Sequence, residues 1–473
     1  MKKQLLTLFI LFLAVPAIFA QSIDKDIKLG AENAKKVEQT MGIYKDSAMT
    51  AYITKVGQRL LSHLDTVLFT YRFAIIPDES PNAFSLPGGY IYITTGLIPL
   101  IETEDELAGI LGHEIIHSNN RHTIRQMKKA IFPAILQLPG NIVGLFSESA
   151  GAMINAPLQA PSALLVASYS RKYENEADAQ GVLLASKAGY EPAALSVVLA
   201  RMSKAIEAET GNKESKSYFS DHPYTPDRSK RIEKESETLK EFKAAPVSSD
   251  FLMEFDGVLY GKDPAQGVVR KNIFLHPDLN MYFEFPKKWA VQNRPEAVMA
   301  MNEKKNAGIY LMPEKEGLSA EEAAGKFMSK LSGQYKNQIK EKKSFDFHGD
   351  KAYMIRFVEA GYNYRNVALV YWLPLNGHLY RVVAMAPEPD ADVLHKSVLS
   401  MRSLTDEERA SIMQSYVHIA RAKEGETLKE LSKRTGNLIN VELTGIINNH
   451  KPADKLKEGE EIKIVLEKPY VKR

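Results

Sequence analysis

Apolar residues recur every three or four positions between residues 23 and 64, in the stretches AENAKKVEQTMG and AMTAYITKVGQRLLSHL. This period places them on one face of a helix, so the pattern predicts two amphipathic helices. The next stretch, YRFAIIPD, alternates like a strand. The glycine pair in SLPGGYIYITT then predicts a turn that leads into a second strand at Tyr90–Thr94.

Two further helices are expected on either side of an apolar segment. The first begins in TEDELAGILGHEIIHSNNRH, where Thr103 and Glu106 have the spacing of a capping box. The second is ASYSRKYENEADAQGVLLASKAGYEP, which ends near Gly189 and Pro192. Residues 130–166 lie between them and are apolar but broken by prolines. We expect this segment to be a helical hairpin with loops that acts as a lid or as a flap facing a membrane.

The downstream pattern changes to alternating strands around one helix, SAEEAAGKFMSKLS, and is typical of antiparallel hairpins. A small unit follows at the C-terminus. The chain of 473 residues is too long for one hydrophobic core. We therefore expect an α+β protein with a segment 1–20 followed by a mainly helical domain with a small sheet at 21–264, an α+β domain at 265–410 and an α/β module at 415–468.

The N-terminal segment MKKQLLTLFILFLAVPAIFA has a basic start, an apolar run and a small final residue, which is typical of a secretory signal peptide. Its removal takes away Lys2 and Lys3 from a formal net charge of only +3, so the mature chain has no charge excess with which to bind nucleic acid. The chain has no cysteine. Export without disulfides favours the periplasm of a Gram-negative bacterium.

Three of the 11 histidines fall within the single stretch HEIIHSNNRH. Positions i and i+4 of a helix share one face, so His113 and His117 can hold one metal ion. Glu114 lies where it can act as general base on a water, which is the pattern of H-E-x-x-H zinc peptidases. Polar residues on a surface helix are the alternative, but the apolar surroundings make that reading weak.

A catalytic zinc needs a third protein ligand. The metzincin continuation is excluded, because its glycine and histidine positions hold Asn120 and Thr123. The stretch SRKYENEAD offers Glu174 as the ligand and Asp178 as the acceptor that holds the other N–H of a ligand histidine. Glu176 points to another side of that helix, and a solvated charged face is the alternative for all three carboxylates.

H-E-x-x-H followed by S-R-x-x-E-x-x-A-D resembles the zinc metallopeptidase family that includes HtpX and the CaaX prenyl proteases, in its soluble periplasmic, BepA-like branch. The matching residues are His113, Glu114, His117, Ser170, Arg171, Glu174, Ala177 and Asp178. The resemblance covers about residues 23–261 and implies a zincin-like domain of the gluzincin type with one Zn²⁺ per chain. BepA-like proteins end in tetratricopeptide repeats, and this chain does not.

The two downstream regions resemble other domains. LYGKDPAQGVV through MYFEFPKKWAV is similar to the PsbP-like α+β domain. The tail is similar to a LysM module at Gly425, Glu426, Thr427, Leu428, Leu456, Gly459 and Ile462. A LysM module implies contact with peptidoglycan, and a plain packing domain is the equal alternative.

These features predict an exported zinc metalloendopeptidase that hydrolyses unfolded or misassembled envelope proteins. Glu114 would take the proton of the attacking water and pass it to the leaving amine. We expect an extended substrate to add to an exposed strand edge formed by Gly88, Gly89, Tyr90, Ile91 and Tyr92. The alternatives are a zinc-containing assembly factor with little protease activity and a peptidoglycan-binding protein; the segment 130–166 could add a peripheral membrane contact.

The stretch DHPYTPDR contains His222 and Arg228. An ordinary loop histidine is the simple interpretation of His222. The BepA-like resemblance instead implies a regulatory histidine here, which would fill the open position of the zinc and block the site. It also implies that Arg228 faces the substrate carbonyl as a transition-state donor.

Overall fold

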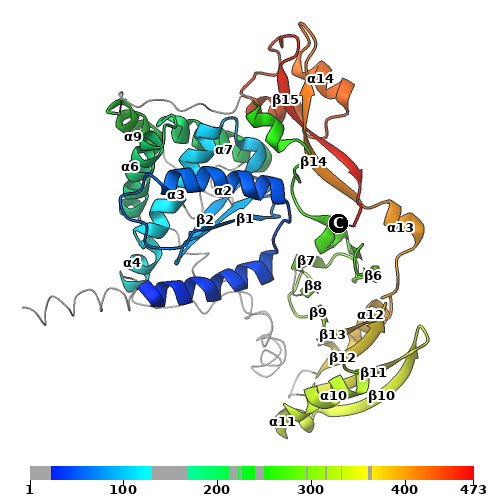
Figure 1. Ribbon diagram of the computed structural model, residues 1–473. Coiled ribbons are helices and arrows are strands. Elements are labelled where there is room, and N and C mark those ends of the chain that lie inside the picture. Colours follow the sequence, from blue (N-terminus) through cyan, green and yellow to red (C-terminus); the bar gives the residue numbers. More distant parts are fainter. Residues whose placement is uncertain are drawn as a thin grey trace, which may run out of the picture. The chain divides into compact units, whose positions relative to one another are not determined.

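The structure is a computed structural model that describes residues 23–129, 169–211, 222, 226–239, 250–294, 297–314, 317–331, 333–360 and 365–472. These residues divide into two compact units (Figure 1). Unit 1 comprises the described residues of 1–133, 161–262 and 415–467, and unit 2 comprises those of 263–414 and 468–473. Helices and sheets occur in both units, which confirms the predicted α+β class. The expected signal peptide at 1–20 and the segment 130–166 lie outside the described residues.

Unit 1 contains a three-stranded sheet in the order β1-β3-β2. Its strands are β1 (Arg72–Ile76), β2 (Ala83–Leu86) and β3 (Tyr90–Thr94). β1 runs parallel to β3, and β2 runs antiparallel to it. Figure 1 shows the helix 23–41 and α2 (Ser47–Leu61) on opposite sides of this sheet. Alternate strand residues therefore enter two cores, with Ile91 and Ile93 on the side of α2 and Tyr92 on the side of the helix 23–41.

The other helices of this part of unit 1 are α3 (Glu104–Asn119), α4 (His122–Lys129), α6 (Arg171–Lys187), α7 (Ala194–Thr210) and α9 (Pro226–Glu237). α3 begins at the predicted N-cap, where the side chain of Thr103 accepts from the Glu106 N–H. The Glu106 carboxylate does not close the predicted capping box. It accepts instead from the Glu102 N–H at 2.7 Å and from the Arg201 guanidinium at 2.6 Å, so it ties α3 to α7.

The C-terminal strands and helices of unit 1 are β14 (Met413–Arg421), α14 (Leu428–Thr435), α15 (Val441–Ile447) and β15 (Glu461–Pro469). They have a small core of their own, yet Val417, Leu443 and Ile447 belong to the same core as α2 and α3. Lys463 is completely buried; its Nζ donates to the Ile101 carbonyl at 2.9 Å and pairs with the Glu102 carboxylate. Residues 415–467 thus share a core and an ion pair with the helical domain.

Unit 2 contains a seven-stranded antiparallel sheet in the order β10-β11-β12-β13-β9-β8-β7 and a three-stranded sheet in the order β4-β5-β6. Its helices are α10 (Ala320–Ser329), α11 (Gly333–Lys336), α12 (Ala391–Val398) and α13 (Asp406–Ala410). The strands are β4 (Val268–Arg270), β5 (Ile273–His276), β6 (Met281–Glu284), β7 (Ala290–Arg294), β8 (Ala297–Met301), β9 (Gly308–Pro313), β10 (Ile339–Phe347), β11 (Asp350–Ala360), β12 (Arg365–Leu375) and β13 (His378–Pro387).

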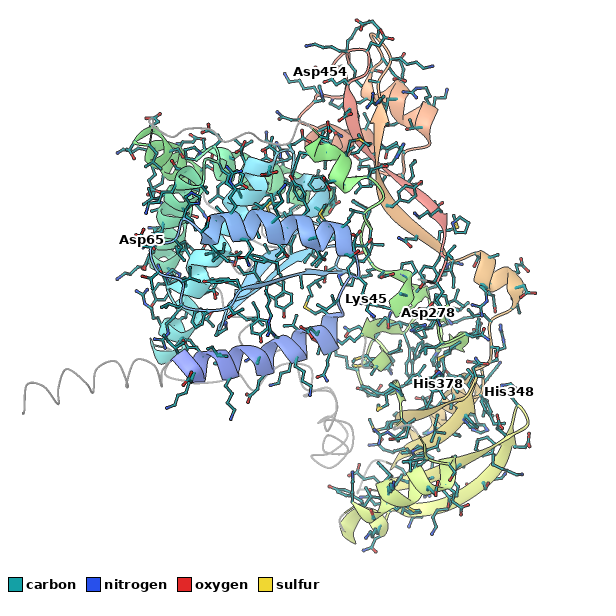
Figure 2. All side chains as sticks on the ribbon, in the orientation of Figure 1. Lys45, Asp65, Asp278, His348, His378 and Asp454 are labelled. Atoms are coloured by element: carbon teal, nitrogen blue, oxygen red, sulfur yellow. The ribbon has the colours of Figure 1, made fainter. Side chains whose placement is uncertain are left out.

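A tight turn joins the antiparallel strands β10 and β11 of unit 2. His348, labelled in Figure 2, has a φ of 54° in the turn between β10 and β11, and the next residue, Gly349, has a φ of 92°. Successive residues with positive φ are typical of tight hairpin turns. The ring of His348 is fixed by a contact of 2.9 Å between its Nε2 and the Met401 carbonyl oxygen. Nowhere in the described residues of the chain does a helix combine the length and the apolar composition that crossing a bilayer requires.

Candidate active site

Two helices that meet at a pair of glycines carry the predicted metal ligands. α3 contributes His113 and His117, and α6 contributes Glu174. A Cβ added to Gly112 would lie 3.1 Å from the Gly181 carbonyl oxygen, and a Cβ added to Gly181 would lie 3.0 Å from the backbone nitrogen of His113. Glycine at both positions lets the two helices approach closely. That approach brings the glutamate of one helix against the histidines of the other.

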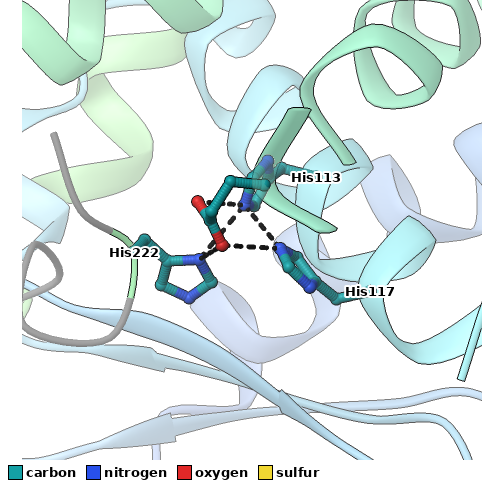
Figure 3. A group of neighbouring side chains, drawn as sticks. His113, His117 and His222 are labelled. Atoms are coloured by element: carbon teal, nitrogen blue, oxygen red, sulfur yellow. Dashed lines mark hydrogen bonds and ion pairs between the residues drawn. The ribbon is translucent and has the colours of Figure 1, made fainter. Parts of the chain in front are cut away.

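Four side chains converge at this crossing (Figure 3). His113, His117, Glu174 and His222 each offer one ligand atom, and these atoms all lie within 4.8 Å of one another. The Nε2 atoms of His113 and His117 are 2.9 Å apart, and Glu174 Oε1 lies 3.3 Å from His117 Nε2. All four residues are buried. Imidazole nitrogens and a carboxylate oxygen, gathered at this spacing and shielded from water, fit a zinc ion.

The surroundings set the protonation of these ligands. Burial lowers the pKa of His117 well below its usual value, which favours the neutral imidazole. Burial opposes ionisation of Glu174, but the charges of His222 and Arg228 and hydrogen bonds with His117 and His222 hold the pKa of Glu174 well below its usual range. Neutral imidazole and ionised carboxylate are the forms that bind a metal.

Glu114 lies beside this group with both carboxylate oxygens buried and without a hydrogen-bond partner among the described residues. Burial raises its pKa, although His222, His113 and Ser85 act in the opposite direction. Glu114 Oε1 lies 3.5 Å from Nε2 of His222, whose Nδ1 lies 3.0 Å from Glu174 Oε1. The imidazole of His222 therefore stands between Glu114 and the ligand carboxylate, where a water would have to lie for Glu114 to deprotonate it.

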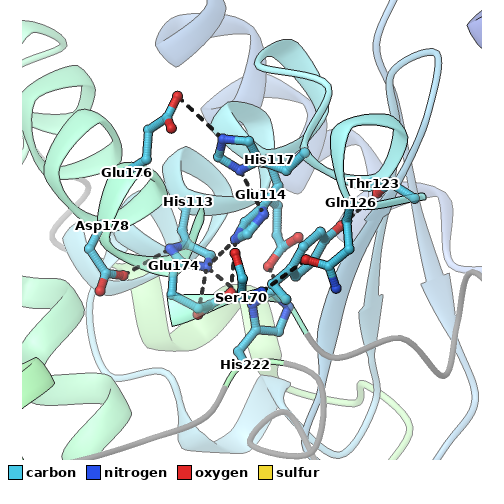
Figure 4. A network of polar contacts seen from close by, with 12 residues as sticks. His113, Glu114, His117, Thr123, Gln126, Ser170, Glu174, Glu176, Asp178 and His222 are labelled. Atoms are coloured by element: carbon cyan, nitrogen blue, oxygen red, sulfur yellow. Dashed lines mark hydrogen bonds and ion pairs between the residues drawn. The ribbon is translucent and has the colours of Figure 1, made fainter. Parts of the chain in front are cut away.

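Asp178 lies one helical turn after Glu174 and binds the far side of His113 (Figure 4). Its Oδ1 is 3.0 Å from Nδ1 of His113, the ring nitrogen that does not face the ligand group. An ionised carboxylate at this nitrogen fixes the tautomer and the orientation of a ligand histidine. The role of Asp178 as the acceptor for a ligand histidine stays a prediction, which this contact supports.

Arg228 holds two of these carboxylates. Its Nε and NH2 donate to the two oxygens of Asp178 at 2.9 and 2.8 Å, and its NH1 lies 3.2 Å from Glu174 Oε2 and 3.3 Å from the His222 carbonyl oxygen. Only 2% of Arg228 is exposed. The guanidinium is thus fully engaged behind the ligand group in this state of the protein. The structure places Arg228 at the site, where its guanidinium contacts the carboxylates of Asp178 and Glu174.

The strand predicted to bind substrate is not at an edge. β3 lies in the middle of the sheet and is paired on both sides, so the prediction of an exposed edge at Tyr90, Ile91 and Tyr92 is wrong. The edge strand that contacts α3 is β2, and its Ser85 acts to lower the pKa of Glu114. This strand order could not be predicted from the sequence, because strand pairing depends on residues far apart in the chain.

The glycine pair has a structural explanation that needs no substrate, and its role in the approach of a substrate stays a prediction. Gly88 and Gly89 have φ values of 82° and 89°, which a turn before β3 requires. A Cβ on Gly88 would lie 3.1 Å from the Cα of Ile27, and one on Gly89 would lie 2.8 Å from the Thr70 carbonyl oxygen. The glycines face the protein's own backbone, including the helix 23–41.

The structure adds two aromatic residues that the sequence analysis did not assign. Tyr169, directly before the second motif, places its ring 4.0 Å from that of His117, and its hydroxyl lies 2.8 Å from Thr123 Oγ1. His122, the third histidine of the first motif, is completely buried, with its Nδ1 3.1 Å from His117 Nδ1. Burial lowers the pKa of His122 to about 4. The clustering of histidines was the one signal in the sequence that could have indicated His122.

Residues 47–236 match the sequence model of peptidase family M48. The mitochondrial metalloendopeptidase OMA1 of Schizosaccharomyces pombe is 30% identical over 237 residues, which cover 48% of this chain and 65% of that protein. The β-barrel assembly-enhancing protease of Escherichia coli is 26% identical over 185 residues, 38% of each protein. The chain therefore spans less than two thirds of the length of these relatives.

A solved structure also matches part of the chain. The solution structure of cyanobacterial PsbP from Synechocystis covers 29% of this chain and 95% of its own, with 11% identity and a TM-score of 0.23. The PsbP-like and LysM-like assignments of the downstream regions stay predictions.

Proposed function

Because residues 47–236 match peptidase family M48, we propose that this protein is a zinc metalloendopeptidase of the bacterial periplasm that cleaves unfolded or misassembled envelope proteins. The observation that carries the proposal is the group of four ligand atoms within 4.8 Å, with Glu114 one residue after His113. The fold of this domain would be zincin-like, of the gluzincin type.

His113, His117 and Glu174 would hold the ion. Bound there, zinc would supply a water of lowered pKa and would polarise the substrate carbonyl. Glu114 would accept the proton of the attacking water and deliver it to the leaving amine; its raised pKa suits a group that must both take and give a proton. Asp178 holds the imidazole of His113 in place throughout.

An extended substrate would bind along β2. Among the described residues this strand pairs only with β3, so its other edge can accept the backbone of a peptide. Backbone pairing reads little sequence, which suits unfolded substrates. All four residues of β2 are buried in this structure, so substrate entry requires the site to open.

Two features support the proposed substrate class and location. One relative carries the name β-barrel assembly-enhancing protease, and the segment 1–20 has the pattern of a signal peptide. The module at 415–468 would add a contact with peptidoglycan.

Self-inhibition by His222 is part of this proposal. Its imidazole lies between Glu174 and Glu114, at 3.0 and 3.5 Å, and so excludes the water that Glu114 would deprotonate. The open state would require the His222 side chain to leave this position. In the closed state His222 would keep its position 3.0 Å from Glu174 Oε1.

Removal of the metal is expected to abolish cleavage of an unfolded protein such as casein, because the ligand set alone cannot polarise the carbonyl. Restoring about one equivalent of Zn²⁺ should restore cleavage. The measurement is the rate of casein cleavage before chelation, after chelation and after zinc addition, with metal content determined at each step. A preparation that binds zinc but never cleaves would instead support the assembly factor. Cleavage that survives complete metal removal would contradict the proposal.

Replacement of His222 by alanine is expected to raise basal cleavage. If the open state makes up about 0.1–10% of the molecules, removing the blocking group should increase the rate on the order of tenfold or more. Casein cleavage is compared at equal zinc content with the wild type and with His63→Ala, which removes an exposed histidine. Equal rates in His222→Ala and wild type would make His222 an ordinary loop residue. Lost activity with retained zinc would make it a catalytic donor.

A further inference from the structure

His122 is a buried histidine that the catalytic steps do not use. It is the first residue of α4 and follows Arg121, which has a φ of 58°. This left-handed residue turns the chain between α3 and α4 and points His122 back at the metal ligands. The Nδ1 of His122 lies 3.1 Å from the Nδ1 of His117.

The orientation of His117 determines which atom donates. Its Nε2 faces the ligand group, at 2.9 Å from His113 Nε2 and 3.3 Å from Glu174 Oε1. A neutral imidazole that gives the lone pair of Nε2 to a metal carries its proton on Nδ1. With a metal on Nε2, His117 would donate that proton to His122 Nδ1, and His122 would carry its own proton on Nε2.

Glu176 is the carboxylate that faces Nε2 of His122. Its Oε1 lies 3.4 Å from His122 Nε2 and accepts from Arg125 NH1 at 3.1 Å and from Asn120 Nδ2 at 3.0 Å. The sequence predicts that Glu176 lies on another side of α6 from the expected ligand Glu174. That placement is compatible with a role in the site, because His122 bridges the distance.

The ring of His122 is also held by stacking. It lies on Tyr173 at 4.7 Å between centroids, with 18° between the ring planes. The guanidinium of Arg125 lies 4.8 Å from the centroid of the same Tyr173 ring. Both nitrogens of His122 are therefore aimed along fixed directions, one at His117 and the other at Glu176.

The two ligand histidines thus have different supports. Nδ1 of His113 lies 3.0 Å from the carboxylate of Asp178, whereas Nδ1 of His117 faces a second imidazole, which in turn faces the carboxylate of Glu176. Groups that orient a metal-bound histidine typically change metal affinity by about 10–100-fold when they are removed. The side chain of Asp178 is completely buried, whereas 24% of the Glu176 side chain is exposed.

We propose that His122 is a positioning residue that holds His117 in its metal-binding orientation, and that Glu176, fixed by Arg125, is the anchor of this series of polar contacts. The inference rests on the proposed zinc site. It assigns a function to the third histidine of the motif and to the carboxylate between Glu174 and Asp178.

The test is zinc affinity, measured by competition of the metal-free full-length protein with a chromophoric chelator. His122→Phe keeps an aromatic ring against Tyr173 but removes the contacts with His117 and Glu176, and should weaken zinc binding about 10–100-fold. His122→Asn retains an acceptor near the position of Nδ1 and should recover most of that loss. Glu176→Gln, which leaves packing unchanged, should weaken binding severalfold. Glu233→Gln on α9 is the matched control and should bind like the wild type.

A spectrum and a stability measurement separate positioning from packing. The visible absorption of the Co²⁺-loaded protein should shift in His122→Phe, because the ligand geometry changes. The thermal midpoint of metal-free Glu176→Gln should match that of the wild type. Equal zinc affinity of wild type and His122→Phe would overturn the inference, as would equal losses in His122→Phe and His122→Asn without a loss in Glu176→Gln. A wild-type chain that binds no zinc would reject the proposed function itself and this inference with it.

Discussion

Glu114→Gln is expected to lose cleavage of unfolded protein by about 100- to 10,000-fold, the usual contribution of a positioned general base. The amide cannot take a proton from water, whereas the three ligands His113, His117 and Glu174 are unchanged. Zinc content should therefore stay near that of the wild type. Because Glu114 is buried without a hydrogen-bond partner among the described residues, the neutral amide should also leave the fold at least as stable.

The comparison requires cleavage rate and zinc content from the same preparations. Asp105→Asn is the matched control, since it removes one negative charge from the same helix, in its first turn and away from the ligands. It should cleave at the wild-type rate. Loss of zinc in Glu114→Gln would make Glu114 a ligand, and cleavage within a few fold of the wild type would remove it from the mechanism.

Arg228→Met is expected to lower the free energy of unfolding by about 3 kcal/mol, because removing one partner of a buried ion pair leaves an uncompensated charge. Asp178 would lose its bidentate partner, and Glu174 would lose the contact of 3.2 Å to NH1. Both carboxylates support the metal group, so zinc affinity should fall as well. Urea unfolding of the metal-free protein gives the first quantity, and chelator competition gives the second.

Arg231→Met is the control for this prediction. Its guanidinium binds the same Asp178 at 2.8 Å, but 31% of the side chain is exposed, so the loss should be only about 0–1 kcal/mol. If Arg228→Met instead unfolds like the wild type, binds zinc normally and turns over slowly, Arg228 acts on the substrate. That result would support the role expected from sequence and would show that its engagement with Asp178 and Glu174 ends when the site opens.

The motifs of α3 and α6 could be recognised in the sequence because residues four positions apart lie on the same face of a helix. His113 and His117 face one group for this reason, and Glu174 and Asp178 lie one turn apart on the opposing helix. The α+β class followed from hydrophobic periodicity in the same local way. The position of His222 at the ligand group could be predicted only from the resemblance to a known family. The local sequence pattern does not show which distant helix a loop contacts.

Tertiary structure alone decided the features that depend on contacts between distant segments. The order β1-β3-β2 places β3 inside the sheet, although its own sequence is equally suited to an edge. Lys463 is buried beside Glu102, more than 350 positions away, and joins residues 415–467 to the helical domain. The partners of His122 and Arg228 are likewise set by how α4, α6 and α9 pack. Local spacing determines which side chains share a face, but only long-range packing determines what that face meets.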